Sequence, residues 1–278
     1  MKKSNAKEKI CGLASYAVLT VLTVAACWFF AGRYGVFGAN MDWISQHSVF
    51  PEYFRQQFYK TGQFFPEYAA NIGGGQNIYN FSYYGLYNPI VLIAYLLPFV
   101  KMSDYLMAAS VICLAVSVCL LYGWLKKRGF STEIALGVAV LFLLAGPMIY
   151  QSCHQIMFVQ YMPFLLMTFL GVDRYWEKGK PGLYSLGVFL MNLTRFYFRL
   201  AGMAAIFLYG WYGYPKGIRK RKLFGFPVPM IVAVLSAGVL LVPTAYAILQ
   251  RSGSSQSQNL KELLMPNLQL DSSLYGTY

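Results

Sequence analysis

The stretch ICGLASYAVLTVLTVAACWFFA, which runs from Ile10 to Ala31, decides the fold class. It contains no charged residue, and it is long enough to cross a bilayer as a helix, which takes about 20 apolar residues. Four lysines precede it, as is typical of a cytoplasmic flank. The alternative is a cleaved signal peptide, but its apolar core would be shorter and a small-residue cleavage site would follow. We therefore expect a retained membrane helix.

The composition of the whole chain agrees with this interpretation. Of the 278 residues, 57% are hydrophobic and only 12% are charged, about half the charged fraction of a typical soluble domain. The 23 Lys and Arg exceed the 10 Asp and Glu. In a soluble protein this excess would indicate nucleic acid, whereas in a membrane protein it collects in cytoplasmic loops. We expect an all-α integral membrane protein whose partner is the lipid bilayer, with no nucleic acid.

Apolar runs and basic flanks together predict about seven transmembrane elements. Residues 183–214 have basic residues on both sides, so they are predicted to form a hairpin of two short helices that turns near 192–199. An amphipathic helix after Pro51 and a short apolar helix at 90–100 are predicted to lie at the membrane surface. The other predicted spans are residues 10–31, 103–125, 132–150, 157–176 and 224–249.

These elements predict a single membrane module over residues 1–278. Its parts are a cytoplasmic tail (1–9), the first helix (10–31), a first external loop (32–102), helices two to seven (103–249) and an external tail (250–278). The N-terminus is expected in the cytoplasm and the C-terminus outside, in a tail that looks cut short. Five cysteines without a CxxC pair indicate neither a disulfide framework nor a zinc site.

Asp42 follows the first helix and is the first candidate for chemistry. A carboxylate at the outer membrane face can act as a general base toward a hydroxyl, and the alternative is a solvated loop residue. His47 and His154 are the only histidines, and both are predicted to be external, where they can meet or remain simple loop residues. The chain has neither a DxD pair nor HExxH. We expect no cofactor and no metal site, while a divalent-metal requirement stays open.

Arg195 and Arg199 are the second candidate pair. They lie four residues apart, on one face of a helix. A guanidinium in a bilayer costs on the order of 3 kcal/mol or more unless it is paired or hydrated. Either the two arginines bind an anion, for which their planar forks suit phosphate, or they reach out to the membrane interface.

A glycine run and a group of tyrosines complete the candidates. Gly73–Gly75 must be loop, and its backbone amides can approach an anion or simply form a turn. Tyr83 and Tyr84 can stack on a sugar or belong to the aromatic belt of the membrane interface.

Taken in chain order, these features resemble the YfhO family of bacterial membrane proteins, which are identified as glycosyltransferases of the GT-C type. The motifs that carry the resemblance are Asp42-Trp-Ile-Ser-Gln-His47, Arg55, Gly62, Gly73-Gly-Gly75, Tyr83-Tyr84, Asn88-Pro89 and Asn192-Leu-Thr-Arg-Phe-Tyr-Phe198. The resemblance covers nearly the whole chain. It implies a GT-C-like bundle with juxtamembrane helices in the first external loop.

The resemblance also implies a reaction and its partners. The donor would be a polyprenyl-phosphate-linked sugar, and the acceptor a cell-envelope polymer such as lipoteichoic acid, at the outer face of the bacterial plasma membrane. Asp42 would be the catalytic base, and Arg195 and Arg199 would bind the donor phosphate. The predicted substrate-binding residues are Gln46, His47, Tyr83, Tyr84, Tyr197 and His154. The alternatives are a transporter or flippase of a lipid-linked or small polar substrate, and an inactive membrane scaffold.

Overall fold

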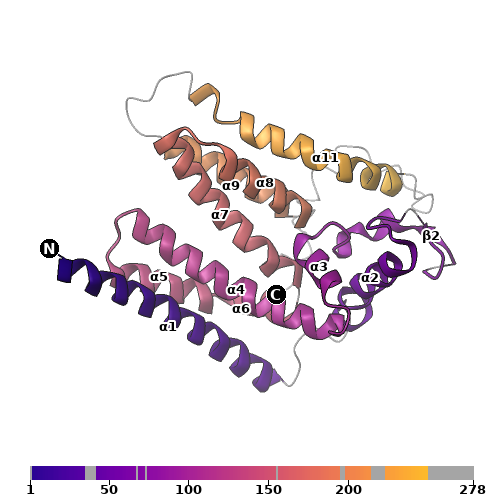
Figure 1. Cartoon of the computed structure of the whole chain (residues 1–278), viewed down its shortest axis with the longest axis horizontal. Coiled ribbons are helices and arrows are strands. Elements are labelled where there is room, and N and C mark those ends of the chain that lie inside the picture. The colour runs from indigo at the N-terminus through magenta and orange to yellow at the C-terminus, as the bar shows by residue number, and fades with distance from the viewer. Residues whose placement is uncertain are drawn as a thin grey trace, which may run out of the picture.

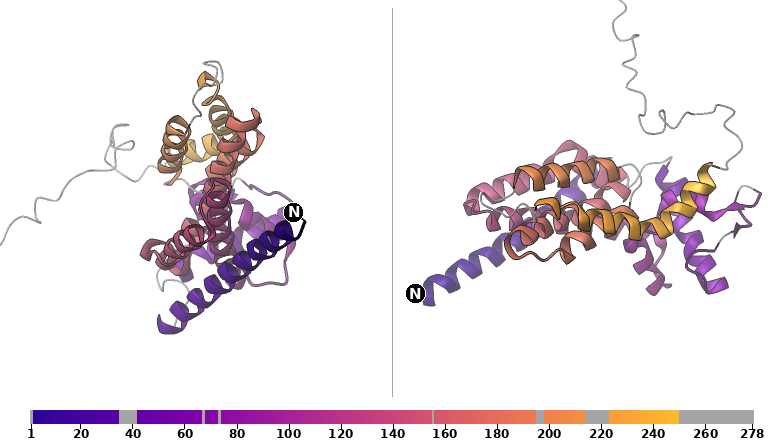
Figure 2. Two further views of the ribbon diagram at one scale, coloured as in Figure 1. Left: turned by 90° about the vertical axis from the view of Figure 1, so that its left-hand side faces the viewer. Right: turned by 90° about the horizontal axis from the view of Figure 1, so that it is seen from above.

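The computed structural model describes residues 2–34, 42–66, 68–72, 74–154, 156–194, 198–213 and 223–249. Long helices lie side by side, and the segment that connects the first long helix to the next covers one end of them (Figure 1). The N-terminus lies at the opposite end (Figures 1 and 2). The chain is thus an all-α protein of the membrane type, as the sequence predicts.

The helices of the bundle have the following bounds: α1 Lys2–Tyr34, α4 Met102–Lys127, α5 Thr132–Leu144, α6 Gly146–His154, α7 Ile156–Lys178, α8 Gly182–Thr194, α9 Phe198–Tyr212 and α11 Val228–Leu249. Within the described ranges, three stretches are long and apolar enough to cross a membrane: 12–33, 102–127 and 228–247. The bent pair α5 and α6 would make a fourth. The count of seven spans therefore stays a prediction.

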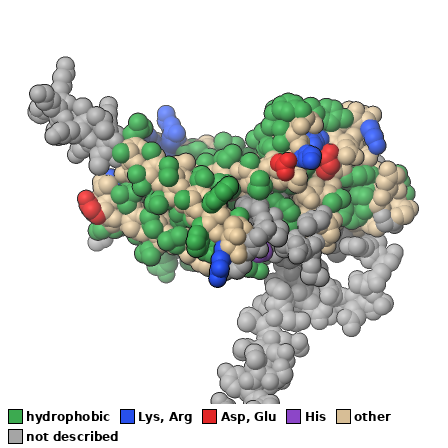
Figure 3. All heavy atoms as spheres, turned by 90° about the horizontal axis from the view of Figure 1, so that it is seen from below, with side chains coloured by type: hydrophobic (Ala, Val, Ile, Leu, Met, Phe, Trp, Pro, Cys, Tyr) green, Lys and Arg blue, Asp and Glu red, His purple; other side chains and the backbone are tan. Residues whose placement is uncertain are grey.

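The bundle is apolar on both its inner and its outer side. Leu19 of α1 and Leu114 and Val118 of α4 are fully buried against one another's helices. Side chains such as Ile112, Leu141 and Val239 are largely exposed. Hydrophobic side chains also cover most of the face in Figure 3, where charged groups occupy only a few places. An apolar outer surface of this kind is suited to contact with lipid.

The region predicted as a single span at 132–150 is broken. The chain leaves the helix at Ala145, which has an extended ψ of 128°, and α5 and α6 are bent by 54°. Gly146-Pro147 accounts for the break, because Pro147 has no amide hydrogen to continue the α5 ladder and Gly146 is a poor helix former. Helix α6 then continues to His154, past residue 150, where the predicted span ends.

The hairpin predicted at 183–214 consists of two short helices, α8 and α9. With 13 and 15 residues, they are about 20 Å long, shorter than the roughly 30 Å core of a bilayer. Helix α1 starts at Lys2, so the predicted cytoplasmic tail is helical over its described residues. Lysine is a good helix former, and this explains the extension.

The segment before α4 forms a small folded unit, which we call the loop segment (residues 42–100). The amphipathic helix predicted after Pro51 is present as α2, and the apolar piece at 90–100 forms short helical turns. A two-stranded hairpin between them was not predicted. The elements are a π-helix η1 Trp43–His47, α2 Val49–Thr61, β1 Tyr68–Ala69, β2 Gln76–Asn77, 3₁₀-helix η2 Ile78–Tyr84, α3 Pro89–Ile93 and 3₁₀-helix η3 Ala94–Leu96.

A hydrophobic core fixes the loop segment to the ends of the bundle helices. Phe54, Ile78 and Leu86 are fully buried in it. Leu193 of α8 and Leu240 of α11 pack against the same core. The C-terminal part of α11 lies beside the loop segment in both Figure 1 and Figure 2. The loop segment is therefore a fixed cap on one end of the bundle.

Candidate functional site

Asp42 stands at the entrance to the loop segment, as the N-cap of the π-helix η1. Its side chain is exposed and makes no capping hydrogen bond to that helix. The next residue, Trp43, is buried in the core of the loop segment. The carboxylate is thus held on a packed turn while it faces outward, a position in which it can accept a proton from a bound hydroxyl.

Four of the predicted substrate-binding residues lie together one turn further on. The Tyr84 hydroxyl donates a hydrogen bond to Oε1 of Gln46 at 2.6 Å. The His47 and Tyr84 rings are 5.9 Å apart between centroids, and Tyr83 meets Tyr84 edge to face at 5.2 Å. His47 is 5% exposed. The structure therefore brings Gln46, His47, Tyr83 and Tyr84 together at the junction of η1 and η2.

A small cavity with a mostly apolar wall lies between these residues and α7. His47, Tyr84, Asn88 and Gln160 are among its lining residues, and its volume of about 10 Å³ is close to that of one water molecule. Asn88 caps α3 through its Oδ1, which is 3.0 Å from the Ile90 amide nitrogen. Its Nδ2 donates to Oε1 of Gln160 at 2.5 Å. Gln160, which the sequence analysis missed, thus anchors the loop segment to the bundle.

Two further hydrogen bonds lie at the same end of the bundle. The hydroxyls of Tyr87 and Thr244 are 3.0 Å apart and join the loop segment to α11. Burial raises the pKa of Tyr87, an effect that the hydrogen bond to Thr244 opposes. The Tyr161 hydroxyl donates to the Phe198 carbonyl at 3.0 Å and joins α7 to the start of α9. These hydrogen bonds join the loop segment to α11 and α7 to α9.

Arg199 lies on the first turn of α9, at this end of the bundle. It is half-buried, and its Nη2 donates to the carbonyl of Asn192 at 3.1 Å. Arg195 and Tyr197 lie outside the described residues. The hydrogen bond to Asn192 holds the Arg199 guanidinium beside the end of α8. Both residues belong to the stretch 192–199, where the sequence predicts that the hairpin turns.

His154 lies at the end of α6. Its Nδ1 is 2.9 Å from the Tyr150 carbonyl of its own helix, and its ring stacks on Tyr150 at 4.1 Å. Both contacts are with a residue of the same helix, and they are enough to explain how the His154 ring is oriented. They give no link to the group around His47.

Gly74 and Gly75 lie in the turn between the two strands. Gly74 and Gly75 have φ values of 79° and 99°, which residues with a side chain rarely adopt. The Gly75 amide donates to the Ile72 carbonyl at 3.0 Å, and a Cβ at Gly75 would lie 1.9 Å from the Tyr68 hydroxyl. These observations favour the turn over the anion site for the described glycines.

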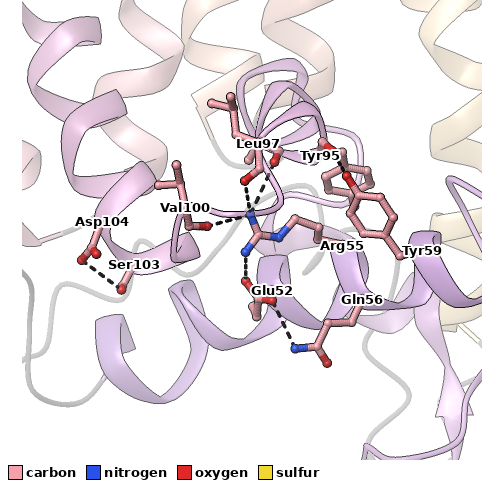
Figure 4. A network of polar contacts seen from close by, with 10 residues as sticks. Glu52, Arg55, Gln56, Tyr59, Tyr95, Leu97, Val100, Ser103 and Asp104 are labelled. Carbon is pink, nitrogen blue, oxygen red and sulfur yellow. Dashed lines mark hydrogen bonds and ion pairs between the residues drawn. The ribbon is translucent and has the colours of Figure 1, made fainter.

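A second polar group, also missed by the sequence analysis, centres on Arg55 of α2 (Figure 4). Its Nη1 donates to the carbonyls of Leu97 and Val100 at 2.9 Å each, and its Nη2 is 2.5 Å from a carboxylate oxygen of Glu52. The Tyr59 hydroxyl donates to the carbonyl of Tyr95. Burial raises the pKa of Tyr95, and the charge of Arg55 opposes that rise. In the sequence, this group is indicated only by Arg55, which is one of the residues that carry the family resemblance.

A third polar group lies at the other end of α7, away from the loop segment. Asp173 is buried there. Its carboxylate accepts a hydrogen bond from Nε1 of Trp124 at 3.0 Å and one from the Tyr209 hydroxyl, and Arg128 is 3.5 Å away. The group joins α4, α7 and α9 and is a structural tie. Among the described residues, no three His, Cys, Asp or Glu side chains gather in a way that could hold a metal ion.

Comparison with known proteins gives one match. A family model described as bacterial membrane protein YfhO matches residues 16–278. No curated protein and no solved structure matches the chain. The matched region begins within α1 and covers the loop segment and the bundle helices that follow. The chain therefore belongs to the YfhO family of bacterial membrane proteins.

Proposed function

We propose that this membrane protein transfers a sugar from a polyprenyl-phosphate donor to an acceptor hydroxyl at the outer face of the bacterial plasma membrane. The observation that carries the proposal is the position of Asp42. Its carboxylate is exposed at the start of a packed π-helical turn, and it makes no capping bond there. An accessible carboxylate on a packed turn beside an apolar bundle suits a base that acts on a lipid-linked substrate.

The reaction assigns a defined task to each group. Asp42 accepts the proton of the acceptor hydroxyl, whose oxygen forms a bond to the anomeric carbon of the sugar. The bond from that carbon to the phosphate oxygen breaks, and polyprenyl phosphate leaves with the electron pair. Negative charge grows on the leaving phosphate, so a cation beside it lowers the barrier. Arg199, with Arg195, is the candidate for this role.

The remaining residues provide the walls of the donor site. Tyr83 and Tyr84 offer aromatic faces, while Gln46 and His47 offer polar groups. Tyr197 and His154 stay proposals on sequence grounds. The acceptor is a cell-envelope polymer such as lipoteichoic acid, and the N-terminus lies in the cytoplasm with the C-terminus outside.

The test is transfer of labelled sugar in membranes that contain the wild-type protein or Asp42→Asn. The substitution keeps the size of the side chain and removes the base. We expect transfer to fall by about two to four orders of magnitude, with the same amount of inserted protein. Glu133→Gln, at an exposed acid elsewhere, is the matched control. Near-normal transfer by Asp42→Asn would remove Asp42 from the mechanism.

A second candidate function is transport of a lipid-linked or small polar substrate. The break between α5 and α6, with its 54° bend, favours it because transporters use discontinuous helices. Reconstituted vesicles discriminate the two. A transporter moves the lipid-linked sugar across the bilayer without forming a product, whereas a transferase needs an acceptor and releases polyprenyl phosphate. An inactive scaffold would do neither.

A further inference from the structure

A hollow beside the loop segment lies on the face of α2 that carries Arg55. Its volume is about 500 Å³, within the range of small-molecule sites. Helix α2 forms one wall, and the chain from η3 into α4 forms the other. The lining residues are Ser48, Val49, Glu52, Tyr53, Arg55, Gln56, Pro98, Phe99, Val100, Lys101, Met102 and Ser103.

The polar groups in this hollow are held in place. Arg55 is 5% exposed. Its Nη1 donates hydrogen bonds to three backbone carbonyls, those of Ala94, Leu97 and Val100. One Glu52 oxygen accepts from Arg55 at 2.5 Å, and the other accepts from Nε2 of Gln56 at 3.1 Å. The Glu52 side chain is still 32% exposed. Each of its oxygens has a further lone pair, so the carboxylate can accept hydrogen bonds from a ligand.

The polar groups of the hollow suit hydroxyl groups. The Arg55 guanidinium is occupied by backbone carbonyls and by the Glu52 carboxylate, whose charge it balances. Lys101, which also lines the hollow, is exposed at the start of α4 and adds one positive charge. Gln56 and Ser103 add neutral donors and acceptors. A carboxylate flanked by an amide and hydroxyls matches the paired hydroxyls of a sugar or another polyol.

The hollow also has an apolar side. Phe99 is 81% exposed although it lines the hollow, and Tyr53 lies across from it on α2. The face of a sugar ring is apolar, and exposed aromatic rings provide a surface on which it can pack. Fixed hydrogen-bonding groups on one side and aromatic rings on the other are a combination that recognises a carbohydrate.

The hollow begins close to Asp42. Its first lining residue is Ser48, and both the amide and the hydroxyl of Ser48 donate to the carbonyl of Trp43, at 3.0 and 2.9 Å. Trp43 is the residue after Asp42. One π-helical turn therefore separates the proposed base from the edge of the hollow.

We propose that this hollow is the acceptor site and that it binds the hydroxyl groups of a sugar or polyol through Glu52 and Gln56, with Phe99 against the apolar face of the ring. The proposal rests on the proposed function, because it names the substrate class that Asp42 would deprotonate. Asp42, at the start of the π-helical turn that ends at the edge of the hollow, would then take the proton of a hydroxyl bound there.

The experiment uses Gln56→Ala and Phe99→Ala, because both side chains are exposed and their loss spares Arg55. In the transfer assay we expect each variant to raise the KM for the acceptor about five- to tenfold, with the KM for the donor and kcat nearly unchanged. Phe99→Tyr keeps the ring and should behave as the wild type. Lys60→Ala, at an exposed position of α2 outside the hollow, is the matched control.

A direct binding measurement separates this proposal from the transferase proposal. Saturation-transfer NMR would use purified full-length protein with methyl glucoside, methyl N-acetylglucosaminide and glycerol as probes. A signal from any probe that Gln56→Ala and Phe99→Ala weaken and Lys60→Ala preserves supports the hollow, even if no transfer is detected. Transfer with an unchanged acceptor KM in both variants would overturn the acceptor site and leave the transferase standing. The absence of binding for all three probes would also overturn it.

Discussion

Arg55 illustrates how one side chain determines the shape of the loop segment. The carbonyls that it binds lie about 40 residues further along the chain, at the end of η3. The sequence shows an arginine on an amphipathic helix, which is ordinarily a solvated position. No local pattern reveals that three carbonyls will face it, because that arrangement depends on how α2 and η3 pack.

Replacement of Arg55 should destabilise the protein. Arg55→Gln leaves the three carbonyls and the partly exposed Glu52 with poorer partners, and an unsatisfied buried polar group costs on the order of 1–3 kcal/mol. We expect the Tm in detergent to fall by roughly 5 °C or more. Arg55→Lys keeps the charge but not the planar fork, so its Tm should lie between those of the wild type and Arg55→Gln. Lys60→Gln should melt as the wild type does, and an unchanged Tm for Arg55→Gln would refute this role.

Other residues of the candidate site could be predicted only in part. Gln46, His47, Tyr83 and Tyr84 were singled out by type and order, and the structure brings them together. Gln160 and Asp173 were missed. A polar residue inside an apolar run needs a hydrogen-bond partner, but the sequence does not show which one. The partner of Gln160 is Asn88 and a partner of Asp173 is Trp124, and both come from distant segments.

At the scale of elements, apolar runs and basic flanks predicted most of the helices. The α8–α9 pair follows from basic residues on both sides of one long apolar run. The break at Ala145 was missed although Gly146-Pro147 is a visible helix breaker. The hairpin of β1 and β2 is only two residues long on each side, too short for any period to show.

The predicted topology can be tested by cysteine labelling in a cysteine-free background. A probe at Gln63, an exposed position of the loop segment, should react from outside intact cells. Probes at Lys180 and Gly217, on either side of the α8–α9 pair, should react only after permeabilisation, because basic flanks stay in the cytoplasm. Reaction at Gly217 from outside would mean that the pair is one span. Reaction at Lys180 from outside would invert the whole orientation.

At the scale of the molecule, the two ends of the bundle differ in kind. One end carries the loop segment, with Asp42, the tyrosines and the hollow beside α2. The other carries Asp173 and the basic residues that follow α4. Helices α4 and α7 join the two ends. Helix α4 exposes apolar side chains such as Ile112, whereas α7 is mostly buried among the other helices. This division is what a transferase with its chemistry at one membrane face requires.

The most direct test of the account is a structure of the protein with a polyprenyl-phosphate-linked sugar bound. We predict that the phosphate lies against Arg199 or Arg195, that the sugar ring lies beside Tyr84, and that the anomeric carbon faces Asp42. The hollow lined by Glu52 and Phe99 should remain open to the acceptor. A donor bound at the Asp173 end of the bundle, or along the lipid-facing surface away from Asp42, would contradict the account.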